Sequence, residues 1–186
     1  MCVKALLGFL FGVALLCEAA AEGAYKFLDE IPIGGEGGWD LVAIDAAAHR
    51  LYLSHATKVV IVDLTKNEVI GEIGDTPGVH GFIVAPDLER GFSSNGKESK
   101  VSVVDLKTLR TISKIETGAN PDALVYEPRR YEVYVFNHSG NSVSVIDAKA
   151  TGIVTTIPLD GNPELDFYKT DRSCRMKRCS LKQPAQ

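Results

Sequence analysis

The sequence predicts an all-β chain built from a repeated sheet of four antiparallel strands, and three observations support this fold class. Nearly the same strand-like phrase occurs three times, as "VVIVDL", "VSVVDL" and "VSVIDA". The aspartates in these phrases, Asp63, Asp105 and Asp147, are spaced by 42 residues each time. Further short runs rich in β-branched and aromatic residues surround each phrase, and they are too brief for helices.

The elements of each repeat follow in a constant order. The first repeat reads "DLVAIDA", "HRLYLSH", "KVVIVDL" and "EVIGEIG"; the third reads "DALVYEP", "YEVYVFN", "SVSVIDA" and "GIVTTIP". In the second repeat the four runs occupy residues 80–87, 90–95, 100–106 and 110–116. The distances from Asp63 to Phe92 and from Asp105 to Tyr134 are both 29 residues, so the register is maintained between repeats.

A period of about 40 residues with four strands in each unit is typical of a β-propeller blade rather than of a helical solenoid. A single four-stranded sheet cannot bury both of its faces, so blades stack around an axis and cover one another. We therefore expect blade 1 at residues 38–74, blade 2 at 78–116 and blade 3 at 120–158. Together with the segments that flank them, they form a partial β-propeller over residues 22–164.

The ends of the second strands carry a resemblance to a known family. "YLSH", "FSSN" and "YVFN" look like variants of the Tyr-Val-Thr-Asn signature of YVTN-family β-propeller repeat proteins, which are mostly exported bacterial proteins. The resemblance covers residues 25 to about 164. It implies a propeller fold with about seven blades in an intact member, and it implies no particular activity.

The first residues have the pattern of a signal peptide at 1–21. Lys4 precedes the apolar run "ALLGFLFGVALL", and "AAA" at 19–21 offers a small-residue cleavage site. The apolar run is too short for a comfortable membrane span. We expect cleavage after Ala21, a chain without a membrane span after this removal, and a periplasmic or secreted location.

Both ends of the repeat region depart from the pattern. Residues 25–34 align with fourth strands but have no preceding three strands, so we predict an orphan outer strand that needs a partner sheet.

Residues 161–164 open a fourth blade, and the pattern then stops. The tail at 165–186 lacks strand alternation and holds Cys174 and Cys179; we interpret it as a frameshift product or mis-called gene end. The alternatives are a specialised cap and a basic partner-binding tail. A truncated ring exposes strand edges and apolar faces, which predicts self-association.

Composition excludes some classes of function. The formal net charge of −4 and the isoelectric point near 5.6 show no signature of nucleic-acid binding. The partner is thus expected to be an unknown protein or small-molecule ligand. The sequence contains no metal-binding or cofactor motif and no catalytic set, and the aspartates at 63, 105 and 147 are expected to cap the turns that follow them.

One set of polar residues predicts a ligand or metal site. Asp40, His80, Asp122 and Glu164 each open the first strand of successive blades, and in such propellers the first strand is the innermost. The four side chains are therefore expected to ring one mouth of the central channel. Carboxylates and an imidazole there suit a divalent cation or a cationic ligand; the alternative is that each only caps its own strand. Trp39 is expected either to line the base of this mouth or only to pack against neighbouring side chains.

The sequence therefore favours an exported, non-catalytic propeller that binds a ligand or serves as a scaffold, present as a fragment. The alternative is an enzyme or electron-transfer partner of the lactonase or dehydrogenase-subunit type that uses the central channel. A third reading is a fragment without function, because its ring cannot close.

Overall fold

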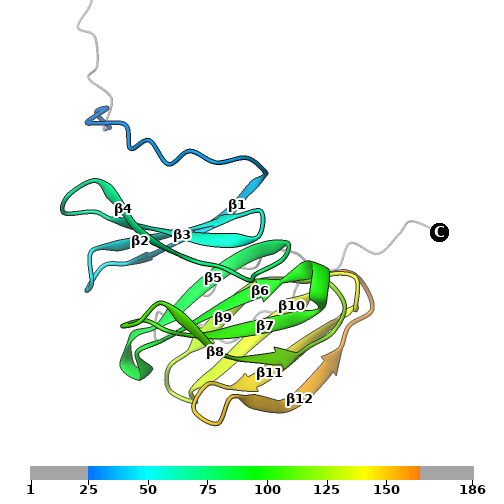
Figure 1. Ribbon diagram of the computed structural model, residues 1–186. Helices are drawn as coiled ribbons and strands as arrows, with labels where there is room; N and C mark the ends of the chain where they lie inside the picture. The colour runs from blue at the N-terminus through cyan, green and yellow to red at the C-terminus, as the bar shows by residue number, and fades with distance from the viewer. Residues whose placement is uncertain (1–24, 164–186) are drawn as a thin grey trace, which may run out of the picture. The chain divides into compact units, whose positions relative to one another are not determined.

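The computed structural model describes residues 25–163, and these form twelve β-strands in three separate sheets (Figure 1). The predicted signal peptide at 1–21, Glu164 and the tail at 165–186 lie outside the described residues. Within the described part, no helix has the length and apolar character needed to cross a membrane. The prediction of an all-β fold with four antiparallel strands per blade is confirmed.

Each sheet consists of four consecutive strands paired in chain order. Blade 1 contains β1 (Trp39–Asp45), β2 (Arg50–His55), β3 (Lys58–Asp63) and β4 (Glu68–Ile73). Blade 2 contains β5 (Val79–Ala85), β6 (Arg90–Asn95), β7 (Lys100–Asp105) and β8 (Arg110–Glu116). Blade 3 contains β9 (Pro121–Glu127), β10 (Glu132–Asn137), β11 (Ser142–Asp147) and β12 (Gly152–Pro158). The sheets lie within the ranges 38–74, 78–116 and 120–158 that the repeat predicted.

The hairpins between third and fourth strands share one turn geometry. Each contains a residue in the left-handed region, with φ of 56° at Asn67, 58° at Leu109 and 56° at Thr151. The aspartate at the start of each turn accepts hydrogen bonds from the backbone N–H groups two and three residues later. The turns therefore stop the strands at the same place in each blade, which fixes the register of the repeat.

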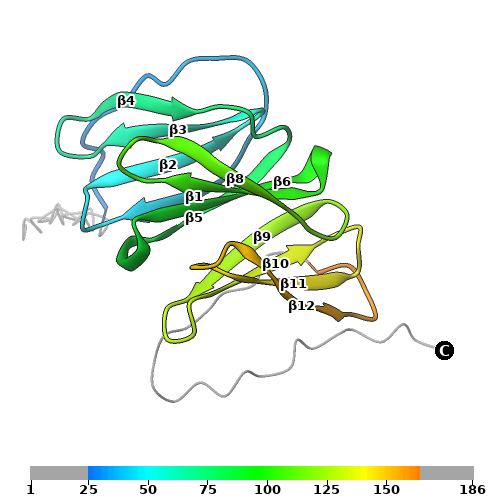
Figure 2. The same cartoon turned by 60° about the horizontal axis from the view of Figure 1, so that its bottom comes forward.

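The first strands β1, β5 and β9 lie next to one another, so they are the innermost strands of the blades (Figure 2). The fourth strands lie at the opposite edge of each sheet. The polar residues at the start of the first strands are thus brought to one end of the stack of blades.

The hydrophobic core lies between the blades. We call the two apolar sides of a blade its front face, which packs on the next blade, and its back face, which packs on the preceding one. The first core joins the front face of blade 1 to the back face of blade 2: Tyr52, Val59, Ile61 and Ile73 against Val79, Phe82, Val104 and Leu106. The second core joins blades 2 and 3 in the same way: Phe92, Val101, Val103 and Ile115 lie against Leu124, Ile146 and Ala148 at equivalent positions, and Val135 is added from the second strand. The same interface therefore occurs twice in this chain.

The orphan strand predicted at residues 25–34 stays a prediction. Residues 25–34 contain no strand residue in the structure. A strand requires a neighbour whose backbone groups pair with its own, and the blade that this segment is expected to complete is not among residues 25–163. The apolar alternation of "YKFLDEIPIG" matches the repeat, but it does not by itself form a strand without a partner.

Candidate functional site

Asp40 and His80 come together at the mouth formed by the innermost strands. Asp40 is the second residue of β1 and His80 the second residue of β5. The Nδ1 atom of His80 lies 2.8 Å from Oδ2 of Asp40, and both side chains are partly exposed. A hydrogen bond here joins blades 1 and 2, and it leaves a carboxylate and an imidazole available at the surface.

The other side of the His80 ring lies against backbone that has no side chain. A Cβ atom added at Gly96 would lie 2.6 Å from Nε2 of His80 and 2.5 Å from Oδ1 of Asn120. Such distances are too short for ordinary contact, so glycine is needed for His80 to lie where it does. Sequence reasoning missed both Gly96 and Asn120. The only signal was the Asn-Gly pair at the end of the second strand of blade 2, which predicted a turn.

Asp122 holds the equivalent position in blade 3 but does not join this pair. No hydrogen bond or ion pair connects its side chain to Asp40 or His80 within the described residues. Its backbone carbonyl lies 3.4 Å from the point where a Cβ on Gly81 would be, next to β5. Among residues 25–163, no group of three or more His, Cys, Asp and Glu side chains is arranged to hold a metal ion. The four-residue ring stays a prediction, because Glu164 lies outside the described part.

Trp39 stacks on an imidazole of its own blade. The ring centroids of Trp39 and His55 are 3.8 Å apart, with an interplanar angle of 17°. His55 is buried, and its Nδ1 atom lies 3.2 Å from the carbonyl oxygen of Gly38. Trp39 itself is 48% exposed, whereas its counterpart Val79 in blade 2 is buried between blades. The structure therefore places Trp39 on the back face of blade 1, beside the mouth.

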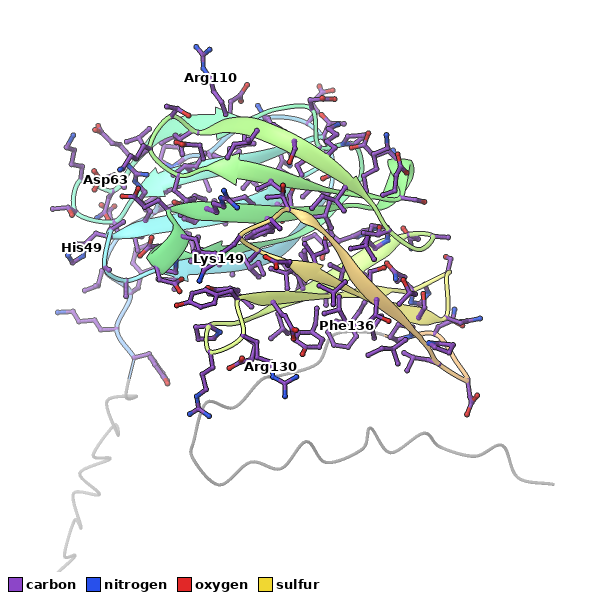
Figure 3. The ribbon with its side chains drawn as sticks, turned by 90° about the horizontal axis from the view of Figure 1, so that it is seen from below. His49, Asp63, Arg110, Arg130, Phe136 and Lys149 are labelled. Carbon is purple, nitrogen blue, oxygen red and sulfur yellow. The ribbon has the colours of Figure 1, made fainter. Side chains whose placement is uncertain are left out.

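The repeated aspartates have a structural arrangement. Oδ1 of Asp63 accepts the N–H groups of Thr65 and Lys66 at 2.8 and 3.1 Å. Asp63 lies beside the turn that contains His49, whose carbonyl oxygen accepts the N–H group of Leu64 (Figure 3). These backbone hydrogen bonds lower the pKa of Asp63 below its ordinary value. The pKa values of Asp105 and Asp147 are lowered for the same reason.

Two arginines connect neighbouring blades at the end of the sheets opposite Asp40 and His80. The sequence analysis did not identify them. Nη1 of Arg50 donates to the carbonyl oxygen of Leu106 at 2.9 Å, from blade 1 to blade 2. Nη1 of Arg90 donates to the carbonyl oxygen of Lys149 at 2.7 Å, from blade 2 to blade 3. The sequence could have indicated these contacts, since both arginines stand at the same repeat position, the first residue of a second strand. In blade 3 this position is Glu132.

A shallow depression of about 360 Å³ lies near Arg50, between blades 1 and 2. Its charged residues include Glu89 and Lys107, whose side chains form an ion pair at 2.6 Å. Because Asp40 and His80 lie on the innermost strands, where the blades converge, we regard the mouth as the better candidate site.

Comparison with solved structures supports the fold. The chain resembles hydrazine synthase from Kuenenia stuttgartiensis, with 26% identity and a TM-score of 0.59 over 62% of this chain and 34% of that chain. It also resembles AztD from Citrobacter koseri, with 14% identity and a TM-score of 0.58 over 75% of this chain and 40% of that one. The WD40 β-propeller domain of Doa1 matches with 12% identity and a TM-score of 0.56 over 66% of this chain and 41% of that one.

These similarities define the class of the fold. Residues 25–163 form three blades of a β-propeller, and these sheets do not close into a ring. It spans between about a third and two fifths of the length of these structures. No protein-family model matches the chain, and no significant match is found among curated proteins.

Proposed function

We propose that this chain is an exported, non-catalytic binding or scaffold protein that uses the mouth of a β-propeller for a ligand with a positive charge. The observation that carries this proposal is the pairing of Asp40 with His80 at 2.8 Å across two innermost strands. The pairing holds a partly exposed carboxylate at the place where the blades converge.

Charge and geometry support a cationic ligand. The Asp40 carboxylate is held by one hydrogen bond from an imidazole, so lone pairs on its oxygens remain available for a further donor. Asp122 opens the innermost strand of the next blade and adds a second carboxylate to the same end of the blades. An ammonium or guanidinium group carries several N–H donors and can bind more than one carboxylate.

The buried polar groups support the assignment to YVTN-type repeat proteins. Nδ2 of Asn95 donates to Oγ of Ser102 at 2.8 Å, and Nδ2 of Asn137 donates to Oγ of Ser144 at 2.9 Å. These are the asparagines of the second-strand ends that resemble the family signature. They join the second strand to the third in blades 2 and 3, which explains in packing terms why the motif recurs there; in blade 1 the position is His55.

The experiment is a calorimetric titration of the purified chain with spermidine and, separately, with Mn²⁺ and Ca²⁺. We expect saturable binding of spermidine that is lost in the double variant Asp40→Asn, Asp122→Asn, and the two metal ions test the alternative that the mouth holds a divalent cation. The matched control is the double variant Glu68→Gln, Glu72→Gln, which removes two carboxylates from the outermost strand β4. Equal loss in both variants, or binding unchanged in the first, would contradict a site at the mouth.

Export is a separate part of the proposal and rests on residues 1–21. Expression of the full chain in a bacterial host, followed by cell fractionation and N-terminal sequencing, tests it. We expect a periplasmic or secreted product that begins at Glu22. A cytoplasmic product that retains Met1 would overturn this part alone.

A propeller enzyme or electron-transfer partner is the second candidate, and one of the similar solved structures is named as an enzyme, hydrazine synthase. The two candidates differ in turnover. A lactonase-type protein hydrolyses simple lactones in a metal-dependent reaction, whereas a binder is stabilised by its ligand without turnover. Lactone hydrolysis that exceeds that of the Asp40→Asn variant would favour the enzyme.

A further inference from the structure

The back face of blade 1 is apolar and is covered only in part: Val60 and Val62 on its third strand are buried, but no blade packs on it among residues 25–163. Four of its residues are Trp39, Val42, Ile44 and Leu64, and all four are exposed among the large hydrophobic side chains of the described chain. Their counterparts in blade 2 are Val79, Phe82, Val84 and Leu106, and all four pack against the front face of blade 1. This face therefore has the composition of an interface and lacks a partner among residues 25–163.

The front face of blade 3 is the matching half. Ile73 in blade 1 and Ile115 in blade 2 are buried on the front faces of their blades, where a following blade covers them. Ile157 occupies the same position in blade 3 and is exposed. Tyr134 takes the position of Tyr52 and Phe92 on this face, and it is only partly buried.

We propose that a second copy of this chain docks head to tail, with the front face of blade 3 in one copy covering the back face of blade 1 in the next. The argument is continuity with an established interface. The same front-to-back packing already occurs twice within the chain, and the two open faces present the two halves of a third. Such a heterologous contact closes into a ring when the rotation between copies allows it.

One residue distinguishes this contact from the two internal ones. Arg50 and Arg90 donate to backbone carbonyls of the next blade, at Leu106 and Lys149 respectively. The equivalent residue in blade 3 is Glu132, whose Oε2 atom accepts a hydrogen bond from the hydroxyl of Tyr134 at 2.6 Å. In the docked pair, Glu132 would face the carbonyl of Leu64 without a proton to donate. The contact between copies is therefore weaker than the contact between blades of one chain.

Sedimentation velocity over a range of protein concentrations tests this proposal. The wild-type chain is expected to form species of two or more copies. Val42→Glu on the back face and Ile157→Glu on the front face are each expected to raise the dissociation constant about tenfold or more, because each buries an unpaired charge. Ile112→Glu is the matched control: Ile112 is exposed on β8 and belongs to neither interblade core.

A mixing experiment distinguishes head-to-tail docking from other contacts. Val42→Glu retains a native front face on blade 3, and Ile157→Glu retains a native back face on blade 1. An equimolar mixture is therefore expected to form a two-copy species that neither variant forms alone. A back-to-back contact would be insensitive to Ile157→Glu and would not be restored by mixing, which would overturn the proposal.

Folding is checked in every variant by far-ultraviolet circular dichroism, and Leu64→Glu provides a second substitution on the back face. Glu132→Arg supplies the missing donor and is expected to tighten association about tenfold. A wild-type chain that remains a monomer at all concentrations, or association that survives both face variants, would contradict docking of a second copy.

Discussion

Val42 and Phe82 occupy the same position in the innermost strands of two neighbouring blades, yet Val42 is 60% exposed and Phe82 only 3%. Both follow the same irregularity in the pairing of first and second strands. Phe82 stacks on Tyr52 of the preceding blade, with ring centroids 4.8 Å apart. The difference shows that a side chain at this first-strand position is buried by the adjacent blade, whereas Val60 and Val62 on the third strand of the same open face are buried without one.

The same lesson holds at the other end of the described blades. Ile73 is 1% exposed and Ile157 is 44% exposed, although both face forward from a fourth strand. Blade 2, which has a neighbour on each side, is thus the best-packed part of the chain, and blades 1 and 3 each leave one apolar face open. Any account of the chain's function must therefore include what contacts these two apolar faces.

The largest expected effect comes from the buried member of the first pair. Phe82→Ala removes an aromatic ring from the core between blades 1 and 2 and is expected to lower the free energy of unfolding by about 3–5 kcal/mol. Val42→Ala alters the exposed equivalent and is expected to change it by less than about 0.5 kcal/mol. Urea unfolding of the monomeric chain measures both. Similar costs at the two positions would show that the blade-by-blade account of burial is wrong.

The residue that begins the second strand extends the comparison between a covered and an open blade face: it is Arg90 in blade 2 and Glu132 in blade 3. Arg90→Met leaves the carbonyls of Ala148 and Lys149 without their donor, and we expect a loss of about 1–2 kcal/mol in stability. Glu132→Met at the same position in blade 3 is expected to change stability by less than about 0.5 kcal/mol. Thermal unfolding followed by circular dichroism provides the comparison, and equal effects would remove the role assigned to Arg90.

Gly96 provides a smaller and more local test. Gly96→Ala places a methyl group where the ring of His80 and the amide of Asn120 now lie, so we expect His80 to move and the pair with Asp40 to weaken. Gly74→Ala is the control, because a Cβ added there has no heavy atom within 4 Å. Chemical shifts of the two imidazoles at positions 80 and 55 report the change. A shift at His80 that is equal in both variants would contradict this contact.

The smallest effect is a pH dependence of the turns. Hydrogen bonds from backbone N–H groups lower the pKa values of Asp63, Asp105 and Asp147 in the folded chain. Their contribution to stability is therefore present above the unfolded pKa, near about 4, and is lost as the pH falls through the lower folded values. Asp105→Asn should flatten the decline in melting temperature below about pH 4. If the melting temperature of Asp105→Asn falls at low pH as steeply as that of the wild-type chain, other groups cause the acid sensitivity.

The sequence predicted the blades well because their determinants are local. Alternating apolar residues, the turn aspartates and the constant spacing to Phe92 and Tyr134 all act within one hairpin or between neighbouring ones. The site was harder to predict. The equal distance of each from its second-strand aromatic residue placed Asp40, His80 and Asp122 at one end. Only the position of each blade decides which side chains meet, and only Asp40 and His80 form a pair.

The remaining differences from the sequence pattern have physical causes of the same kind. Residues 25–34 match the repeat in their side chains, but a strand forms only against a partner strand, and the blade that this segment is expected to complete is not among residues 25–163. Gly96 and Asn120 appeared to serve only their turns, because the contact with His80 links blade 2 to the start of blade 3 and is not visible within one repeat.

The measurement that tests the account most directly is quenching of Trp39 by iodide. Trp39 is the single tryptophan of the chain and lies half-exposed on the open back face of blade 1. The account predicts efficient quenching at low protein concentration and protection, with emission shifted to the blue, as the concentration rises. It also predicts that Ile157→Glu, a substitution in blade 3, abolishes this protection. Quenching that is independent of concentration, or protection that persists in Ile157→Glu, would contradict the claim that these two faces meet.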